Sequence, residues 1–278
     1  TKAVTSLIAA LLVRHHKIYW NTKIFDLFPE WKAESNPAYL DLTLQDLLAF
    51  RAKLPPYTYT NRLPKKFKGD YAQQRRQLAE WFLKQKPNET KDELKLTNAG
   101  YIIGGLMLEK ASGKTYKELV EDLGAKIGIN FGFDYPNLSD ESQTWGHDAK
   151  LKPLPPKENY KLRWLLSAGN INVNLPDYAK FIQFQLRGLN RKTDLLPHKE
   201  FEFLHYGFPD FAVGWFWKIN DNNHRVSYNT GNAGAFTTEV YVVKDADRAY
   251  ILFANSATDK TSEGLKSLLD SMIKKYGE

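Results

Sequence analysis

The stretch TKAVTSLIAALLV, residues 1–13, is the most informative part of the sequence. Its large apolar side chains follow a spacing of three and one, which places them on one face of a helix. These side chains are Val4, Leu7, Ile8, Leu11 and Leu12. The alanines between them leave little polar surface, and a helix that is apolar nearly all round is usually buried. We therefore predict a core helix over residues 3–15, with a lysine, Lys2, at its beginning.

The composition bounds the class of protein. The chain has 278 residues, of which 42% are hydrophobic, and this suits one large domain or two modest ones. It contains no cysteine, which excludes disulfides, thiolate metal sites and cysteine nucleophiles. The longest apolar run, residues 7–13, is shorter than the roughly 18 residues that span a membrane. We therefore expect no transmembrane segment in this chain.

The charge is basic, with 39 lysines and arginines against 32 acidic residues and a net charge of +7. An anionic partner such as a nucleic acid or an envelope polymer would fit this balance. The basic residues are scattered, however, and no zinc-finger or helix-turn-helix pattern is present. The six histidines also lack the spacing of a metal site. We expect no nucleic-acid partner, no metal and no cofactor.

Helix signals dominate the first three quarters of the chain, and strand signals follow after residue 205. The expected helix starts are Thr43 with Asp46, Thr97, Thr115 with Glu118, and Asn174 with Pro176. The expected helix ends are Gly113 and Gly188.

Strands are predicted within residues 211–219, 235–245 and 248–256, and a tight hairpin is predicted between the last two. A final helix should pack on the sheet through a single face, formed by Leu265, Leu268, Leu269, Met272, Ile273 and Tyr276.

Four blocks of sequence, in this order and spacing, resemble the serine β-lactamase and penicillin-binding (DD-peptidase) superfamily, closest to its class C-like branch. The blocks are residues 1–31, LTNAGYIIGGLMLEKASGKTYKEL at 96–119, LLSAGNINVNLPDYAKF at 165–181, and VGWFW at 213–217 followed by YNTGNAGAFTTEVYVV at 228–243. The resemblance covers essentially the whole chain. It implies an α/β (α+β) fold in which an antiparallel sheet flanked by helices is joined to a mostly helical region.

The resemblance also implies a division of the chain into two parts. Residues 1–20 and 205–278 would form the sheet-and-helix part, completed by residues that precede the given chain. Residues 21–204 would form the mostly helical part. The active cleft of the family would then lie between the two parts.

The first motif concerns Lys2. In this family a Ser-x-Thr-Lys motif opens the first catalytic helix, and the nucleophilic serine stands three residues before the lysine. That position lies outside the given chain, so we expect these residues to be a C-terminal portion of a longer polypeptide. Lys2 would take the proton of this serine. Ser6 cannot replace the nucleophilic serine, because it comes after Lys2, one helical turn further along. The plain alternative for Lys2 is a surface lysine at a ragged end.

The second motif, Tyr-x-Asn in the family, reads Leu96-Thr97-Asn98 here. Asn98 is kept and would hold substrate and lysine in place, unless it is an ordinary residue at the start of a helix. Leu96 at the tyrosine position cannot carry a proton, and loss of a general acid–base typically costs about 10²–10⁴ in rate. Nothing in the sequence places another phenol at this position. The tyrosines that could replace it are Tyr57, Tyr59 and Tyr101.

The third motif, Lys-Thr-Gly or His-Thr-Gly in the family, reads Asn229-Thr230-Gly231. Its cation binds the substrate carboxylate, so Asn229 would hold anionic substrates less well. Gly231 would let a substrate backbone approach the strand, and the main-chain N–H of Asn232 would serve the oxyanion hole. The plain alternative is a turn between strands.

Three functions are compatible with these residues. The first is a serine hydrolase that acts by acyl transfer on an amide or ester, such as an envelope peptide. The second is a catalytically impaired module that binds peptidoglycan peptides without turnover. The third is a basic protein with an unrelated interaction role. The first two imply a small-molecule or peptide partner, and the resemblance implies the bacterial periplasm or cell envelope.

Overall fold

The chain forms two compact units. The computed structural model describes residues 1–58, 66–89, 94–157 and 159–277. The first unit comprises Thr1–Leu123 with Tyr160–Asn170, and the second comprises Gly124–Asn159 with Ile171–Glu278. These bounds differ from the division expected from the sequence at residues 20 and 204, which stays a prediction. The fold class is confirmed, because helices and an antiparallel sheet make up the chain.

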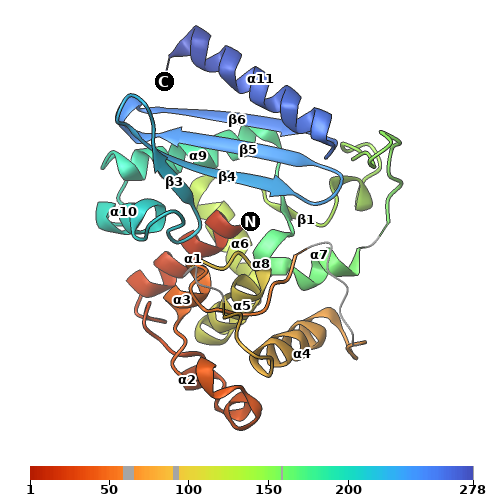
Figure 1. Cartoon of the computed structure of the whole chain (residues 1–278), viewed down its shortest axis with the longest axis vertical. Helices are drawn as coiled ribbons and strands as arrows, with labels where there is room; N and C mark the ends of the chain where they lie inside the picture. Colours follow the sequence, from red (N-terminus) through yellow and green to blue (C-terminus); the bar gives the residue numbers. More distant parts are fainter. Residues whose placement is uncertain (59–65, 90–93, 158, 278) are drawn as a thin grey trace. The chain divides into compact units, whose positions relative to one another are not determined.

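The first unit is helical and is built around α5 (Asn98–Ser112). The helices that pack against α5 include α1 (Lys2–Arg14), α3 (Leu44–Leu48), α4 (Tyr71–Leu83) and α8 (Leu166–Gly169) (Figure 1). Residues 3–11 of α1 are all buried, so the predicted core helix is confirmed. The remaining helical segments are α2 (Ile24–Leu27), η1 (Pro29–Glu34), η2 (Pro37–Tyr39), α6 (Tyr116–Ile127, which continues into the second unit) and α7 (Tyr160–Trp164).

The predicted helix starts of the first unit are confirmed. Thr43 and Asp46 bond reciprocally, as the Asp46 N–H donates to the Thr43 hydroxyl and the Thr43 N–H donates to the Asp46 carboxylate. Thr115 and Glu118 form the same box at the start of α6. The hydroxyl of Thr97 accepts from the N–H of Ala99. These bonds satisfy N–H groups that have no partner within the helix.

The second unit contains a four-stranded antiparallel sheet in the order β3-β4-β5-β6. The strands are β3 (Phe216–Ile219), β4 (Arg225–Asn232), β5 (Thr237–Val243) and β6 (Arg248–Ala254). The short segment η4 (Lys244–Ala246) and Asp247 at φ 47° make the predicted hairpin between the last two strands. The unit also contains the small pair β1 (Gly132–Phe133) and β2 (Ile171–Asn172), and the segment η3 (Pro136–Leu138).

Helices cover both faces of this sheet (Figure 1). On one face, α11 (Asp259–Tyr276) packs Leu265 and Leu269 against Tyr250 and Leu252 of β6. On the other face, α9 (Leu175–Leu189) meets β6 through the rings of its Tyr178 and of Phe253 on the strand. The helix α10 (His198–Tyr206) packs on α9 and β3. Alternation along β6 therefore supplies two apolar faces, one for each helix.

Three expectations about the second unit were wrong. The segment 211–219 is not one strand, because Gly214 at φ 99° turns the chain and Phe211 pairs back on Phe216. In α11, Leu268 and Tyr276 are exposed, because they lie beyond the narrow stripe that meets the sheet.

The third error concerns Gly188, which does not end its helix. Asn174 caps α9 and Pro176 lies in the first turn as predicted, but the helix continues to Leu189. A Cβ atom on Gly188 would lie 2.3 Å from the ring of Phe201. The glycine is therefore needed for the close approach of α10 to α9, and not for a helix stop.

The core of the second unit holds a buried histidine between neutral partners. His205 has one ring nitrogen 2.7 Å from the hydroxyl of Ser227 and the other 3.2 Å from the amide oxygen of Gln185. Its ring stacks on Trp215, with the ring centroids 4.4 Å apart. Burial lowers the pKa of His205 from 6.5 to about 3, with the charge of Glu202 opposing this shift.

This histidine predicts a loss of stability in acid. The folded-state pKa lies below the unfolded-state value, so the neutral ring stabilises the fold above pH 6.5 and this contribution is lost as the pH falls toward about 3. Between about pH 7.5 and about pH 5, the parent should lose about 2 kcal/mol more unfolding free energy than His205→Gln does. Urea unfolding at the two pH values measures this difference. The exposed-site control His15→Gln should behave like the parent, and equal losses in all three proteins would refute the assignment.

Candidate active site

Lys2 is the first residue of α1, and its ammonium group makes two hydrogen bonds within the first unit. Its Nζ atom donates to the side-chain oxygen of Asn98 at 2.8 Å and to the main-chain carbonyl of Ala168 at 2.8 Å. The two acceptors come from the start of α5 and from α8. Lys2 therefore connects α1 to two segments that are far from it in the sequence, which does not fit a loose surface lysine.

The environment of Lys2 favours its neutral form more than water does. Burial lowers the pKa of Lys2 from 10.5 to about 8. At that pKa about one lysine in ten is uncharged at pH 7, against about one in three thousand at 10.5. The Nζ atom also lies over the Tyr101 ring, 5.5 Å from its centroid. Lys2 can therefore both accept a proton and hold it, which is the requirement for a general base near neutral pH.

The segment 55–57 holds the main chain at Asn98 and Thr97. The N–H of Asn98 donates to the carbonyl of Tyr57 at 2.9 Å. The hydroxyl of Thr97 accepts from the N–H of Tyr57 at 3.0 Å and donates to the carbonyl of Pro55 at 2.8 Å. The segment 55–57 is thus attached to the start of α5, and the Asn98 side chain is directed at Lys2.

No replacement for the family tyrosine is found among the tyrosines that the structure describes around this motif. Leu96 is 54% exposed and offers no proton. The hydroxyl of Tyr101 donates to the carbonyl of Leu48 at 2.7 Å and lies 3.2 Å from the hydroxyl of Ser6, and burial raises its pKa. Burial also raises the pKa of Tyr57 to about 12. Tyr59 lies outside the described residues.

The residues Asn229, Thr230, Gly231 and Asn232 are the last four of β4, in the second unit. The amide nitrogen of Asn229 donates to the carbonyl of Gly214 at 2.8 Å, so one donor of this side chain is already used. A Cβ atom on Gly231 would lie 2.4 Å from the hydroxyl of Thr238, so that hydroxyl would have to move to admit a side chain here. The binding roles of these four residues stay a prediction.

The strand β3 does not extend along this segment of β4. Among the described residues, β3 pairs with β4 only over residues 225–228, and Phe216 lies opposite Tyr228. On its other side, Asn229 to Asn232 pair with Val240 to Thr237 of β5. Main-chain N–H and C=O groups on the β3 side of this segment are therefore not used by β3, and a strand edge that its neighbour leaves unpaired can accept an extended peptide.

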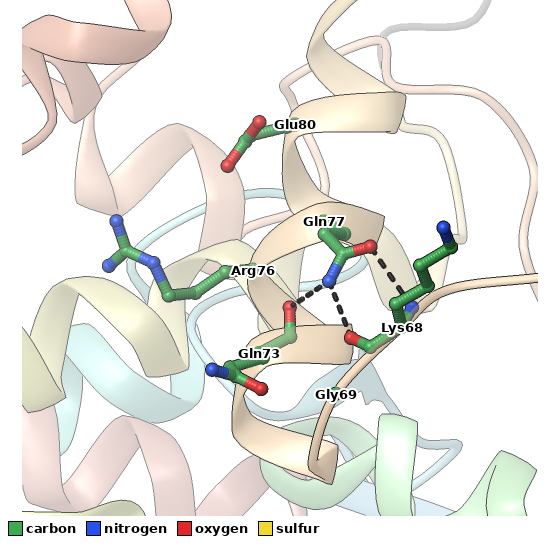
Figure 2. A pocket seen from close by; sticks show the side chains of 6 residues that line it. All are labelled: Lys68, Gly69, Gln73, Arg76, Gln77 and Glu80. Carbon is green, nitrogen blue, oxygen red and sulfur yellow. Dashed lines mark hydrogen bonds between the residues drawn. The ribbon is translucent and has the colours of Figure 1, made fainter.

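A separate polar hollow of about 460 Å³ lies on α4 and includes none of these residues. Figure 2 shows that Gln77 bonds both the N–H and the carbonyl of Lys68 and also the carbonyl of Gln73. The other side chains around it are Arg76 and Glu80. Lys68, Gln73 and Gln77 are bonded to one another, and Arg76 pairs with Glu30 outside the hollow.

Sequence reasoning missed one component of the site, the carbonyl of Ala168. This residue lies in the third block of resemblance, but a main-chain acceptor leaves no side-chain signal. Within the described part of the chain, no three His, Asp or Glu side chains are grouped as metal ligands. None of the helices described there is long and apolar enough to cross a membrane.

Comparisons with known proteins bear on the family and on the fold. The family model described as Beta-lactamase matches residues 1–270. A comparison of the sequence with curated proteins finds no significant match.

Three solved structures illustrate the structural similarity. A class C β-lactamase from Rhodobacter sphaeroides has a TM-score of 0.72 at 14% identity, over 92% of this chain and 78% of that chain. A D-amino acid amidase from Ochrobactrum anthropi has a TM-score of 0.70 at 17% identity, over 93% and 76%. An octameric penicillin-binding protein homologue from Pyrococcus abyssi has a TM-score of 0.70 at 17% identity, over 92% of this chain and 60% of that one. At these identities the similarity shows the fold alone, and the chain spans less than two thirds of the Pyrococcus protein.

Proposed function

We propose, from the premise that this chain belongs to the beta-lactamase family, that the full-length protein is a serine hydrolase. It would act by acyl transfer on an amide or ester. The observation that carries this proposal is the Lys2 ammonium group, held by Asn98 and the Ala168 carbonyl and shifted by burial to a pKa of about 8. A lysine of this kind can activate a hydroxyl that is a poor nucleophile at its own pKa.

The nucleophile of the proposed reaction would be a serine three residues before the lysine, as in the motif of the family. Neutral Lys2 removes the proton of the serine hydroxyl while the serine oxygen forms a bond to the substrate carbonyl carbon. The Lys2 ammonium group that results donates to Asn98 and to the Ala168 carbonyl, so the proton is held where these two oxygens accept it.

The proton must then reach the leaving group. In the family motif a tyrosine shares this task, but Leu96 cannot. Lys2 would therefore return the proton to the leaving nitrogen or oxygen as the carbonyl–heteroatom bond breaks. Water then attacks the acyl-enzyme, and Lys2 takes one proton of that water. Lys2 gives this proton to the serine oxygen as the bond between that oxygen and the acyl carbon breaks. One group doing both tasks predicts a slow enzyme compared with one that has a separate phenol.

The proposed substrate is a small molecule or peptide without a strong requirement for a carboxylate. Asn229 brings no charge to the strand position where the family has a cation. The similar structures include a D-amino acid amidase and a penicillin-binding protein homologue, which makes an envelope peptide of peptidoglycan origin a reasonable first substrate to test. A location in the bacterial periplasm or envelope belongs to the same proposal.

A binding module without turnover is the second candidate function. Two observations favour it: Leu96 stands at the tyrosine position, and one amide donor of Asn229 is occupied by the Gly214 carbonyl. Such a module would bind peptidoglycan peptides along the part of β4 that β3 leaves unpaired, without forming an acyl-enzyme.

Covalent labelling separates the two candidates. We expect the full-length protein to be labelled by a fluorescent penicillin or an activated ester on the serine that precedes Lys2, and mass spectrometry of the labelled peptide locates the adduct. Changing that serine to alanine should abolish the label. A residue other than serine at this position, or no label above the alanine control, would exclude the hydrolase and leave the binding module.

A further inference from the structure

A pair of buried hydroxyl groups lies behind Lys2 and has no part in the reaction proposed above. The hydroxyl of Thr5, one turn along α1 from Lys2, lies 2.6 Å from the phenol oxygen of Tyr116 at the start of α6. Both side chains are fully buried. Buried hydroxyl groups need partners, and the identity of these partners shows what the pair does.

Thr5 connects Tyr116 to the segment that bonds Lys2. The Thr5 hydroxyl donates to the carbonyl of Ser167 at 2.7 Å, and the next carbonyl, of Ala168, accepts from Lys2 at 2.8 Å. Consecutive carbonyls of α8 are thus bonded by two residues of α1. Thr5 therefore bonds the carbonyl that precedes the acceptor of Lys2.

The proton count gives this chain of bonds a direction. A threonine hydroxyl has one proton, and the Ser167 carbonyl can only accept. The Thr5 proton therefore points at Ser167, since the other acceptor, the Thr1 carbonyl, is further away at 3.2 Å. Tyr116 must then donate its own proton to Thr5. Burial raises the pKa of Tyr116, so it keeps this proton at neutral pH.

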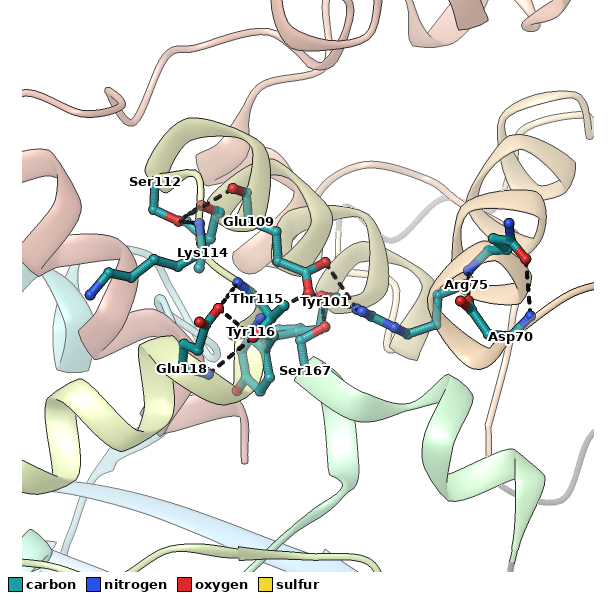
Figure 3. Close-up of polar contacts among 12 residues, drawn as sticks. Asp70, Arg75, Tyr101, Glu109, Ser112, Lys114, Thr115, Tyr116, Glu118 and Ser167 are labelled. Carbon is teal, nitrogen blue, oxygen red and sulfur yellow. Dashed lines mark hydrogen bonds and ion pairs between the residues drawn. The ribbon is translucent and has the colours of Figure 1, made fainter.

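Tyr116 is itself fixed from its main-chain side. Its N–H donates to the carboxylate of Glu109 at 2.8 Å, and Glu109 is paired with the buried Arg75 at 2.9 Å (Figure 3). The reciprocal Thr115–Glu118 bonds hold the same turn. The phenol oxygen is therefore presented to Thr5 by a rigid helix start.

The turn that carries Ser167 is fixed from the side of α5 as well. The Ser167 hydroxyl donates to the carbonyl of Tyr101 at 2.8 Å, and it occupies space that a Cβ atom on Gly105 would fill at 2.1 Å. The side chain of Ser167 thus docks on α5, while its carbonyl is left for Thr5. Small movements of this peptide would carry the Ala168 carbonyl with it.

We propose that Thr5 and Tyr116 are positioning residues, which hold the 167–168 peptide so that the Ala168 carbonyl meets the Lys2 ammonium group. This inference rests on the proposed role of Lys2 as the general base. Neither residue touches the reacting atoms. Their effect passes through one peptide to the hydrogen bond that stabilises charged Lys2.

The test measures the pKa of Lys2 directly in the full-length protein. Acetic anhydride reacts with the neutral amine only, and mass spectrometry of the Lys2 peptide over a range of pH gives its titration. We expect Thr5→Val, which keeps the shape but removes the hydroxyl, to lower the measured pKa of Lys2 by about one unit, because the charged form loses a well-placed acceptor. The matched control Thr5→Ser keeps the hydroxyl and should leave the pKa within about 0.3 unit of the parent.

Tyr116→Phe provides a second arm that survives if Thr5→Val does not fold. It should lower the pKa of Lys2 by a smaller amount in the same direction. Because Tyr116 acts through Thr5, the double variant should show the shift of Thr5→Val alone and not the sum. A purely structural role would lower the melting temperature and leave the titration of Lys2 unchanged.

The outcomes separate this inference from the proposed function. An unchanged or raised Lys2 pKa in both Thr5→Val and Tyr116→Phe overturns the positioning role, whatever the protein does to esters. A lowered pKa supports it even if no serine is acylated, because the reagent reports on Lys2 and not on turnover. If no serine is labelled but both variants lower the Lys2 pKa as expected, only the proposed hydrolase activity is contradicted.

Discussion

Replacement of Lys2 by alanine in the full-length protein is expected to slow acylation of the serine by about 10²–10⁴-fold. The reason is that Lys2 is the general base in the proposed reaction, and its amine lies between Asn98 and the Ala168 carbonyl with a pKa of about 8. Stopped-flow or gel-based labelling with an activated ester measures the rate. The parent rate should rise with pH up to about 8 and then level off, because only neutral Lys2 accepts the proton.

The matched control for this experiment is Lys17→Ala, which removes an exposed lysine just after the same helix. It should label at the parent rate. A Lys2→Ala protein that folds and still labels within about threefold of the parent would remove Lys2 from the mechanism, since a general base is worth far more than that. The activity would then have to come from another base.

The sequence predicts the helical part of the fold well, because its signals are local. The apolar stripe of α1, the reciprocal Thr43–Asp46 and Thr115–Glu118 boxes, and the cap at Asn174 are each contained within a few residues, and all are found as predicted. The errors arise where tertiary contacts decide. Gly188 reads as a helix stop until the ring of Phe201 is seen against it.

The candidate site shows the same division between local and distant information. Lys2 and Asn98 were expected together only because the motifs resemble those of a known family. In the structure, the Nζ atom of Lys2 lies 2.8 Å from the side-chain oxygen of Asn98. The Ala168 carbonyl and the Thr5–Tyr116 bond could not be predicted. One is a main-chain atom, and the other joins residues separated by 111 positions, with no pattern to connect them.

The structure also shows that Tyr101 does not replace the tyrosine that is lost at Leu96. Tyr101 lies beside Lys2 with its ring, while its hydroxyl is bonded to the Leu48 carbonyl. It contributes an aromatic surface next to the cation and no proton relay. No residue of α5 therefore replaces the missing phenol, and proton transfer in the proposed reaction depends on Lys2.

Restoring the phenol gives the second large effect. We expect Leu96→Tyr in the full-length protein to raise the acylation rate by up to about 10²-fold, because a second proton carrier returns where the family keeps one. Leu96 is 54% exposed, so a larger ring can extend toward solvent without the 1–3 kcal/mol or so that overpacking costs in a core. The rate of labelling by a fluorescent penicillin measures the gain, with the serine-to-alanine variant as the control.

Adding Asn229→Lys should favour substrates that bear a carboxylate, since it supplies the absent charge.

The matched variant Leu96→Phe decides whether the hydroxyl is responsible. Phenylalanine brings the same ring and nearly the same volume, so any gain from packing or from substrate contact should appear in both variants. Only tyrosine can carry a proton. A Tyr variant that labels at least tenfold faster than the Phe variant, with similar melting temperatures, would show that position 96 serves the catalytic proton path. Equal rates for the two variants would mean that Leu96 lies outside this path, and that the tyrosine of the family motif has no functional counterpart at this position.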